Sequence, residues 1–283
     1  MILGNGMFCN YTCLQFRRIS NKAVWRFCID GECIMEETKI TGKREPRDVK
    51  SIELLYQPVF DIHLNMAIDY DTGMRINDRK LGVLMPHSFI TIAEKSNQIC
   101  ELGKWALEEG CDAILRCEKR EVDINRLILF TSTKHLAKKN FVAQMTKIVE
   151  TKGVQPDKFC FNINESILES EKTQIIKNIK DLRQYGFLVS IDDFGVEYTS
   201  LSHLGQYEVD YIGLNDSMLE NISSDERAQN MLQGIIDFAK KLDTRIKVNG
   251  VDSQQQADLL RLMGADQMKG ALYGTPILEK SIS

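Results

Sequence analysis

Apolar, β-prone segments alternate with amphipathic segments along most of this chain, and this alternation restricts the possible folds more than any other feature. About 230 residues of such alternation favour a parallel sheet, and roughly eight units fit a closed barrel better than an open sheet. We therefore expect an α/β protein with a TIM-like (βα)8 barrel. Strands are predicted at 52–62, 127–130, 159–163, 187–191, 211–214, 246–248 and 266–272, and helices at 85–96, 99–117, 136–152, 175–186, 231–242 and 253–263.

The start of the chain does not follow this alternation. Ala23–Ile29 and Cys33–Ile40 are β-prone runs on either side of Asp30-Gly31, a dipeptide that favours the tight turn of a β-hairpin. A charged linker is expected after them. The chain is therefore predicted to consist of an N-terminal extension, residues 1–48, and a barrel domain, residues 49–283.

Half of the eight cysteines lie in the extension, at positions 9, 13, 28 and 33. Their spacing loosely resembles that of a zinc ribbon, although it lacks the tight two-residue knuckle of such sites. The preferred interpretation is a small hairpin with reduced, buried thiols, and the zinc site is the alternative. Scattered cysteines in a long chain without a signal peptide are typical of a reducing compartment.

Charge and hydropathy exclude several classes of partner. The chain of 283 residues carries 36 Lys and Arg against 40 Asp and Glu, a net charge of -4. This balance gives no electrostatic reason to bind nucleic acid or an anionic membrane. No apolar run approaches the roughly 20 residues that span a bilayer. We therefore expect a soluble, cytoplasmic protein that does not contact nucleic acid.

Two adjacent acids, Asp192 and Asp193, follow the apolar run 187–191 and precede Gly195 and a hydroxyl-rich loop. A buried strand that ends in two carboxylates delivers them to the mouth of a barrel, the end at which such folds place their functional groups. The alternative is an Asx-type turn that closes the strand. The neighbouring sequence favours a functional site over the turn.

Several separated landmarks occur in the order and spacing of a known family. They are Tyr56-Gln57-Pro58-Val59-Phe60-Asp61, Pro86-x-x-Phe89-Ile90, Ile191-Asp192-Asp193-Phe194-Gly195, Val209-Asp210-Tyr211-Ile212, Gly250-Val251 and Gly270-x-Leu272-x-Gly274-x-Pro276. From residue 51 to about 278 the chain resembles the EAL domain, a family of bacterial phosphodiesterases that linearise cyclic di-GMP. The resemblance implies a (βα)8 barrel in which acids and an asparagine hold two divalent cations that activate a water.

The resemblance also shows which of the family's metal ligands are changed. Asp71 stands for the glutamate of the Glu-x-Leu-x-Arg signature and Asp192 is retained, so these two are the vestigial metal ligands. Phe130 stands in place of a metal-binding asparagine, and Asn162 and Asn249 in place of glutamates. Divalent cations are expected to bind weakly to a site with so little negative charge.

Other family positions are changed or kept as follows. Gly213 replaces a lysine and Asn215 an aspartate, whereas Glu165, which supports a loop in the family, is retained. Loss of one preorganised electrostatic group typically costs about 10² to 10³ in rate, and several are lost here. We therefore predict no catalytic residues and no useful hydrolysis of cyclic di-GMP.

Three functions remain open. The first is a catalytically inactive EAL-like regulator that binds another, unknown regulatory protein, with a homodimer as a further expectation and no cofactor. The second is a non-hydrolytic receptor for cyclic di-GMP. The third is a weak phosphodiesterase that uses one Mg²⁺ or Mn²⁺ at Asp71 and Asp192. The residues expected to contact cyclic di-GMP, if it binds, are Gln57, Arg75, Asp192, Asp193 and Lys269.

Overall fold

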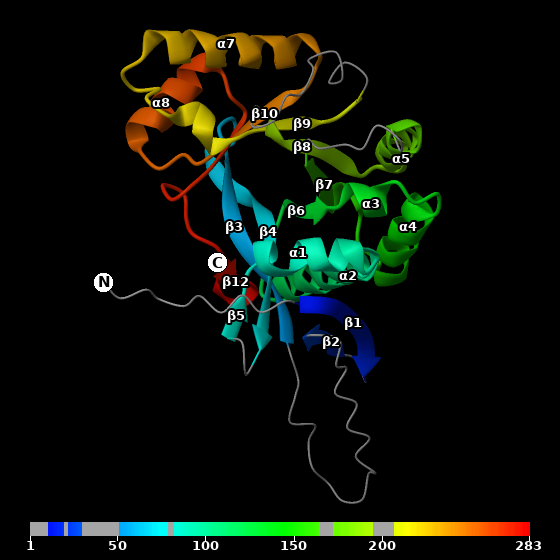
Figure 1. Cartoon of the computed structure of the whole chain (residues 1–283). Helices are drawn as coiled ribbons and strands as arrows, with labels where there is room; N and C mark the ends of the chain where they lie inside the picture. Colours follow the sequence, from blue (N-terminus) through cyan, green and yellow to red (C-terminus); the bar gives the residue numbers. More distant parts are fainter. Residues whose placement is uncertain (1–10, 20–21, 30–50, 79–81, 165–171, 195–206) are drawn as a thin grey trace, which may run out of the picture. The chain divides into compact units, whose positions relative to one another are not determined.

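The computed structural model describes residues 11–19, 22–29, 51–78, 82–164, 172–194 and 207–283 (Figure 1). The chain forms two compact units. The first consists of Met1–Glu53 and Met74–Leu102, and the second of Leu54–Gly73 and Gly103–Ser283.

Eight strands form a closed barrel, as the alternation in the sequence predicts. Pairing between β3 and β4 closes the ring in the order β3-β11-β10-β9-β8-β7-β6-β4. Neighbouring strands from β4 to β11 run parallel, whereas β3 runs antiparallel to β11. The barrel strands are β3 (Ser51–Asp61), β4 (Met66–Asp78), β6 (Arg126–Thr131), β7 (Phe159–Asn164), β8 (Leu188–Phe194), β9 (Tyr211–Leu214), β10 (Arg245–Asn249) and β11 (Gln267–Lys269).

Two further strands extend the sheet beyond the ring. β5 (Gly82–Leu84) pairs with the end of β4, and β12 (Ile277–Leu278) pairs with β3 at Leu55 and Tyr56. The last barrel strand is shorter than the predicted 266–272, because the chain turns at Gly270. A Cβ atom at Gly270 would lie 2.1 Å from the Val251 carbonyl oxygen, so only glycine fits at this turn.

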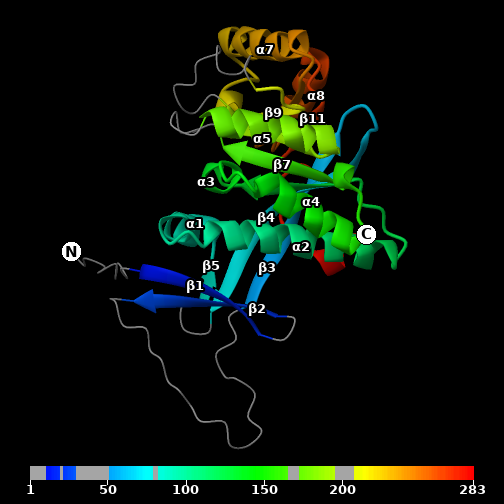
Figure 2. The same cartoon turned by 90° about the vertical axis from the view of Figure 1, so that its right-hand side faces the viewer.

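In the second unit, helices follow the strands and lie on the outside of the sheet (Figures 1 and 2). The predicted capping box of Ser253 and Gln256 starts α8, and Gly153, with a φ of 70°, ends α4 as expected. The helices of this unit are α2 (Ile99–Glu118), whose first residues belong to the first unit, α3 (Thr133–Leu136), α4 (Phe141–Lys152), α5 (Lys172–Tyr185), α7 (Glu226–Lys241) and α8 (Gln254–Met263), with 3-10 turns η1 (Pro156–Lys158), η3 (Asp216–Leu219) and η4 (Glu279–Ser281). Helix α1 (Pro86–Lys95) belongs to the first unit. None of the described helices is long and apolar enough to cross a membrane.

Strand β4 is not predicted by the sequence analysis. Its buried positions alternate between residues 70 and 78, which is the pattern of a strand, but they include Thr72 and Asp78 together with Met74 and Ile76. Polar residues on the buried face hide the alternation of apolar side chains that identifies a strand.

In the first unit, β1 (Tyr11–Ile19) pairs antiparallel with β2 (Lys22–Ile29). The strand predicted at Ala23–Ile29 is confirmed, but its partner here is a segment that the sequence analysis does not assign to a strand. The predicted partner, Cys33–Ile40, lies outside the described residues, as does Cys9. Cys13 and Cys28 are register partners in the β1–β2 pair.

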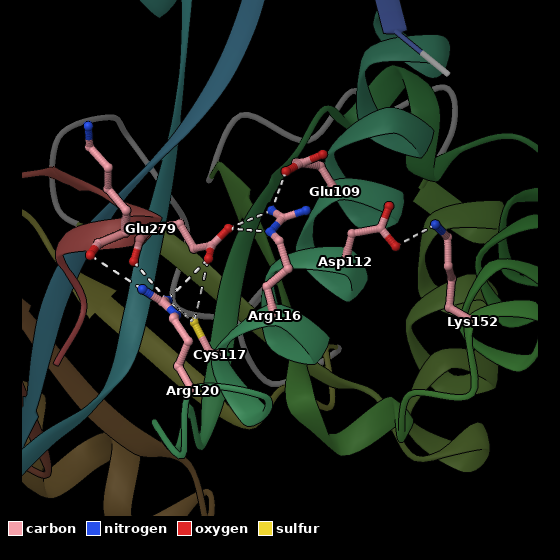
Figure 3. Close-up of polar contacts among 8 residues, drawn as sticks. Glu109, Asp112, Arg116, Cys117, Arg120, Lys152 and Glu279 are labelled. Carbon is pink, nitrogen blue, oxygen red and sulfur yellow. Dashed lines mark hydrogen bonds and ion pairs between the residues drawn. The ribbon is translucent and has the colours of Figure 1, made fainter. Parts of the chain in front are cut away.

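Arginines near the end of α2 anchor the last 3-10 turn in the second unit (Figure 3). The Arg116 Nε donates to a Glu279 carboxylate oxygen at 2.6 Å, and the Arg120 guanidinium lies 3.1 Å from the other oxygen. On the same helix, Asp112 accepts from Lys152 of α4 at 2.5 Å. These ion pairs fix η4 and α4 against α2.

Burial makes the thiols of the second unit poorly reactive. Cys111, Cys117 and Cys160 are free thiols. Burial raises the pKa of the Cys111 and Cys160 thiols to about 12, which suppresses the reactive thiolate.

Candidate functional site

A bulge in β8 directs the two adjacent acids to different partners. The pairing register between β8 and β9 shifts between Ile191 and Phe194, and Asp193 adopts a left-handed φ of 60°. Such a bulge changes the directions of the side chains that follow it. Asp192 consequently lies buried inside the barrel, whereas Asp193 is only partly buried.

Three donors, one from β7 and two from β10, surround the Asp192 carboxylate. One oxygen accepts from the Asn162 amide of β7 at 2.7 Å and lies 3.4 Å from the Lys247 ammonium of β10. The other accepts from the Asn249 amide at 2.8 Å. Burial raises the pKa of Asp192, but the lysines and both amides lower it more, so the net pKa lies well below the usual range of an aspartate.

Lys247 is the cation at the centre of this site, with a side chain that is 1% exposed. Burial lowers its pKa, but attraction to Asp192 and Asp71 raises it more, so the ammonium stays charged. Gly213 of β9 is the register partner of Lys247. A Cβ atom at Gly213 would lie 1.8 Å from an Asp192 oxygen and 3.2 Å from the Lys247 side chain, so the ion pair occupies the space beside this glycine.

A second ion pair lies at the same end of the barrel. The Lys269 ammonium, at the end of β11, bonds directly to the Asp71 carboxylate of β4. Lys269 also acts electrostatically on Asp192, and Asp71 acts on Lys247. We refer to Asp71, Asp192, Lys247 and Lys269 as the mouth cluster. Its two carboxylates and two ammonium groups sum to zero charge.

Asp193 is held by amides rather than by cations. Its two carboxylate oxygens accept from the side-chain amides of Asn164 at 3.2 Å and Asn215 at 3.0 Å. The second aspartate therefore links the ends of β7 and β9.

The residues of the mouth do not fit the pair of divalent cations that the resemblance implies. Divalent cations such as Mg²⁺ and Ca²⁺ require several anionic oxygens, whereas the carboxylates here are paired with ammonium groups that repel a cation. The Asn162 and Asn249 amides turn their nitrogens to Asp192, and their oxygens are buried without a hydrogen-bond partner. Phe130, the register partner of Asn162, supplies no oxygen.

No three His, Cys, Asp or Glu side chains come together as a metal site within the part of the chain that the structure describes.

The other predicted ligand contacts lie as follows. Arg75 is in the first unit, where its guanidinium binds Glu53 through two contacts of 2.9 Å. The Gln57 amide donates to the Gly274 carbonyl at 3.0 Å and so holds the loop after β11. Glu165 lies outside the described residues. Of the predicted set, the structure brings Asp71, Asp192 and Lys269 together in one cluster.

Sequence reasoning misses two features of the barrel interior. The first is Lys247, although a lysine between Ile246 and Val248 in a predicted buried strand is a signal of an interior cation. The second is a polar network at the amino ends of the strands, which we call the base cluster. It comprises Asp69, Asn125, Arg126, Tyr211 and Gln267.

Buried Asp69 is the centre of the base cluster. It accepts from the Asn125 amide at 2.6 Å, the Gln267 amide at 2.7 Å and the Arg126 guanidinium at 3.3 Å. Lys247 and the base cluster residues Asp69, Arg126, Tyr211 and Gln267 line one small interior pocket together with Ile128, Cys160 and Ser190.

The closed eight-stranded barrel and its paired carboxylates at the strand ends define a TIM-like barrel protein of the EAL type. The family model described as "EAL domain" matches residues 44–276. The chain belongs to the EAL domain family.

Known proteins with similar sequences come from several bacteria. The oxygen sensor protein DosP of Escherichia coli is 24% identical over 82% of this chain and 29% of its own length. The cyclic di-GMP phosphodiesterase PA2567 of Pseudomonas aeruginosa is 22% identical over 82% of this chain and 40% of its own. The chain thus spans less than half of the length of these relatives.

Solved structures show the same fold. The PaMucR phosphodiesterase, in complex with c-di-GMP, superimposes with a TM-score of 0.75 at 21% identity and covers 82% of this chain and 94% of its own. The FimX EAL domain from Pseudomonas aeruginosa, bound to c-di-GMP, gives a TM-score of 0.72 at 18% identity, over 80% of this chain and 90% of its own.

Proposed function

We propose that this member of the EAL family is a signalling protein that does not hydrolyse cyclic di-GMP and acts by binding another protein. One observation carries this proposal: each of the three carboxylates at the barrel mouth is already bonded to a side-chain donor. Asp192 binds Lys247 and two amides, Asp71 binds Lys269, and Asp193 binds two amides.

Metal-dependent hydrolysis of a phosphodiester has requirements that this arrangement does not supply. It needs an activated water and a cation that stabilises the attacking and leaving oxygens. The carboxylates that would hold the cation are occupied by ammonium groups, and no carboxylate stands at Asn162 or Asn249 to accept a proton. We therefore assign no catalytic residue and no cofactor. Mg²⁺ or Mn²⁺ would be a cofactor only if the chain had residual activity.

The barrel itself is preserved. Its strands retain fully buried apolar side chains, such as Val59, Val189, Ile246 and Met268, which support the fold independently of any chemistry at the mouth. A rigid barrel that performs no reaction still offers its surface to a partner. A regulatory role through protein contact therefore fits an intact fold with a neutralised mouth.

Incubation with cyclic di-GMP and Mg²⁺ or Mn²⁺, followed by chromatography, tests the absence of hydrolysis. The PA2567 phosphodiesterase, run in parallel, is the positive control. We expect no linear dinucleotide from this chain. Linear product that is lost in the Asp71→Asn variant would overturn the proposal and would support a weak enzyme at Asp71 and Asp192.

Affinity capture from the native host tests the protein partner, and light scattering during size-exclusion chromatography tests the predicted homodimer. A partner that binds this chain, and is released by substitutions on the barrel surface, is the expected result. Capture of nothing above background under native conditions would contradict the proposed mode of action. Fluorescence microscopy of a tagged chain tests the predicted cytoplasmic location.

A non-hydrolytic cyclic di-GMP receptor is the second candidate. It is favoured by the solved structures with this fold whose names state that c-di-GMP is bound. Isothermal titration with cyclic di-GMP, with and without Ca²⁺, tests it. Heat of binding without hydrolysis would establish this function, and no heat well above micromolar ligand would exclude it.

A further inference from the structure

We propose that Lys247 and Lys269 are permanent counter-cations of the barrel mouth, which neutralise its two interior carboxylates in place of divalent metal ions. The negative charge of the mouth is thus balanced without a metal ion. The inference rests on the proposed function in one respect, since both assign no divalent cation to this site.

The first argument is the arrangement of charge. Each carboxylate of the mouth cluster has its own ammonium group, Lys247 for Asp192 and Lys269 for Asp71. Each pair also acts on the other, because Lys269 acts on Asp192 and Asp71 acts on Lys247. A buried carboxylate requires opposite charge and hydrogen-bond donors, and the cluster supplies both from the chain itself.

The second argument is space. Lys247 is fully buried, and its side chain passes next to Gly213, its register partner on β9. A Cβ atom at Gly213 would lie within 3.2 Å of the Lys247 side chain and 1.8 Å of Asp192. The absence of a side chain at position 213 therefore makes room for the ion pair. Lys247 is therefore a core residue of the barrel and not a surface lysine.

The third argument is the orientation of the amides. Both Asn162 and Asn249 donate from their amide nitrogens to Asp192, one to each carboxylate oxygen. A bound dication would instead call for oxygen from these residues. The neutral amides and the buried ammonium therefore form one consistent donor set around Asp192.

Thermal unfolding of the full chain, with and without millimolar Mn²⁺, tests the proposal. The unaltered chain should show the same Tm in both conditions. The Lys247→Met and Lys269→Met double variant should unfold about 10 °C lower, because it leaves buried carboxylates without counter-charge. Mn²⁺ should restore a large part of this loss, because the freed carboxylates then bind the metal.

Lys152→Met is the matched control. Lys152 also forms an ion pair with an aspartate, Asp112, but on the partly exposed helical surface. Its replacement should change Tm by no more than a few degrees, and Mn²⁺ should not alter the result.

Two results would overturn the proposal: a rise in Tm of the unaltered chain with Mn²⁺, or a Lys247→Met variant as stable as the unaltered chain. If the double variant does not fold, Lys269→Met alone decides, since its ion pair is nearer the surface. This variant should fold, lose a few degrees and regain them with Mn²⁺; a folded variant without a Mn²⁺ response contradicts the proposal.

Different experimental results would contradict the proposed function and the proposed role of the lysines. Linear dinucleotide product from the unaltered chain overturns the proposed function. A stable Lys247→Met variant in a chain that still gives no product overturns the role of the lysines alone.

Discussion

The two ends of the barrel interior each pair a buried aspartate with a cation, but they do so in different ways. At the base, Asp69 faces Arg126, whose side chain is 15% exposed and also reaches the Tyr211 hydroxyl and the Asp157 carbonyl, each at 3.2 Å. At the mouth, Asp192 faces Lys247, which is 1% exposed. The Arg126 guanidinium at the base has several hydrogen-bond partners and reaches solvent, whereas the Lys247 ammonium at the mouth is fully buried and bonds directly to Asp192. We infer that the mouth tolerates the loss of a charge less well than the base.

The largest expected effect is the loss of the acid at each end. Asp192→Asn removes the carboxylate that bonds directly to the buried Lys247 ammonium, which should lower the free energy of unfolding by about 3–5 kcal/mol. Asp69→Asn should cost about 1–3 kcal/mol, because Arg126 keeps other partners and reaches solvent. Urea unfolding of both variants at neutral pH measures the difference.

The pH dependence of the Asp192→Asn variant provides a control. An unpaired buried lysine has a lowered pKa, so the unfolded state binds more protons below its ordinary pKa of 10.5. The stability of this variant should therefore rise as the pH rises toward that value. Equal losses at both ends, or no recovery at high pH, would remove the proposed contrast between mouth and base.

Acid unfolding provides the second comparison, between the mouth and a buried histidine outside it. Burial, with Lys104 and Lys138 nearby, lowers the pKa of His135 to about 4. Between its ordinary value of 6.5 and about 4, the unfolded state binds a proton that the folded state does not, so stability falls as the pH falls. The loss should reach up to about 3 kcal/mol.

Asp192 should not contribute to this acid loss. The pKa of Asp192 lies below its ordinary 3.8, so its stabilising effect is present above that value and is lost only at lower pH. Urea midpoints from pH 7 to pH 4 for the unaltered chain and for His135→Gln measure the effect. A loss of the same size in His135→Gln would show that other groups, the mouth cluster among them, titrate in this range.

The smallest expected effects come from glycine substitutions. Gly213→Ala inserts a methyl group against Asp192 and Lys247, and should cost about 1–3 kcal/mol through overpacking. Gly234→Ala is the matched control, because nothing lies within 4 Å of its Cβ position on the exposed side of α7. It should stabilise the chain by about 0.5–1 kcal/mol, the helix propensity difference.

The Gly213→Ala cost should also depend on Asp192. In an Asp192→Ala background the methyl group has room, so the added cost of Gly213→Ala should largely disappear, and a double-mutant cycle in urea measures this coupling. Independent effects of the two substitutions would show that Gly213 does not make room for the ion pair.

The sequence predicts the barrel well because the strands of its second half are apolar runs bounded by turns. It does not predict β4, whose buried face contains Thr72 and Asp78. Periodicity detects a strand by apolar alternation, so a strand with polar residues on its buried face escapes it. The pairing of β2 with Tyr11–Ile19 also depends on contacts that no local pattern specifies.

The candidate site is predicted in part. The resemblance to the EAL domain places Asp71, Asp192 and Lys269 in one site, but it assigns Lys269 to contact with cyclic di-GMP and not to an ion pair with Asp71. Its ion pair with Asp71 joins strands that are 198 residues apart in the sequence, which only the closed barrel brings together. Lys247 is missed because the resemblance places the lysine of the site at position 213 on β9, whereas this chain has glycine there and a buried lysine on the neighbouring strand β10.

The shared space of Gly213 and Lys247 also limits how this mouth can change. A lysine at position 213 has no room while Asp192 and Lys247 hold their places, and loss of Lys247 alone leaves Asp192 unpaired. Each single step toward an arrangement with the cation on β9 therefore passes through a crowded or a charge-deficient intermediate. Packing, and not only the missing acids, makes the present arrangement difficult to reverse one substitution at a time.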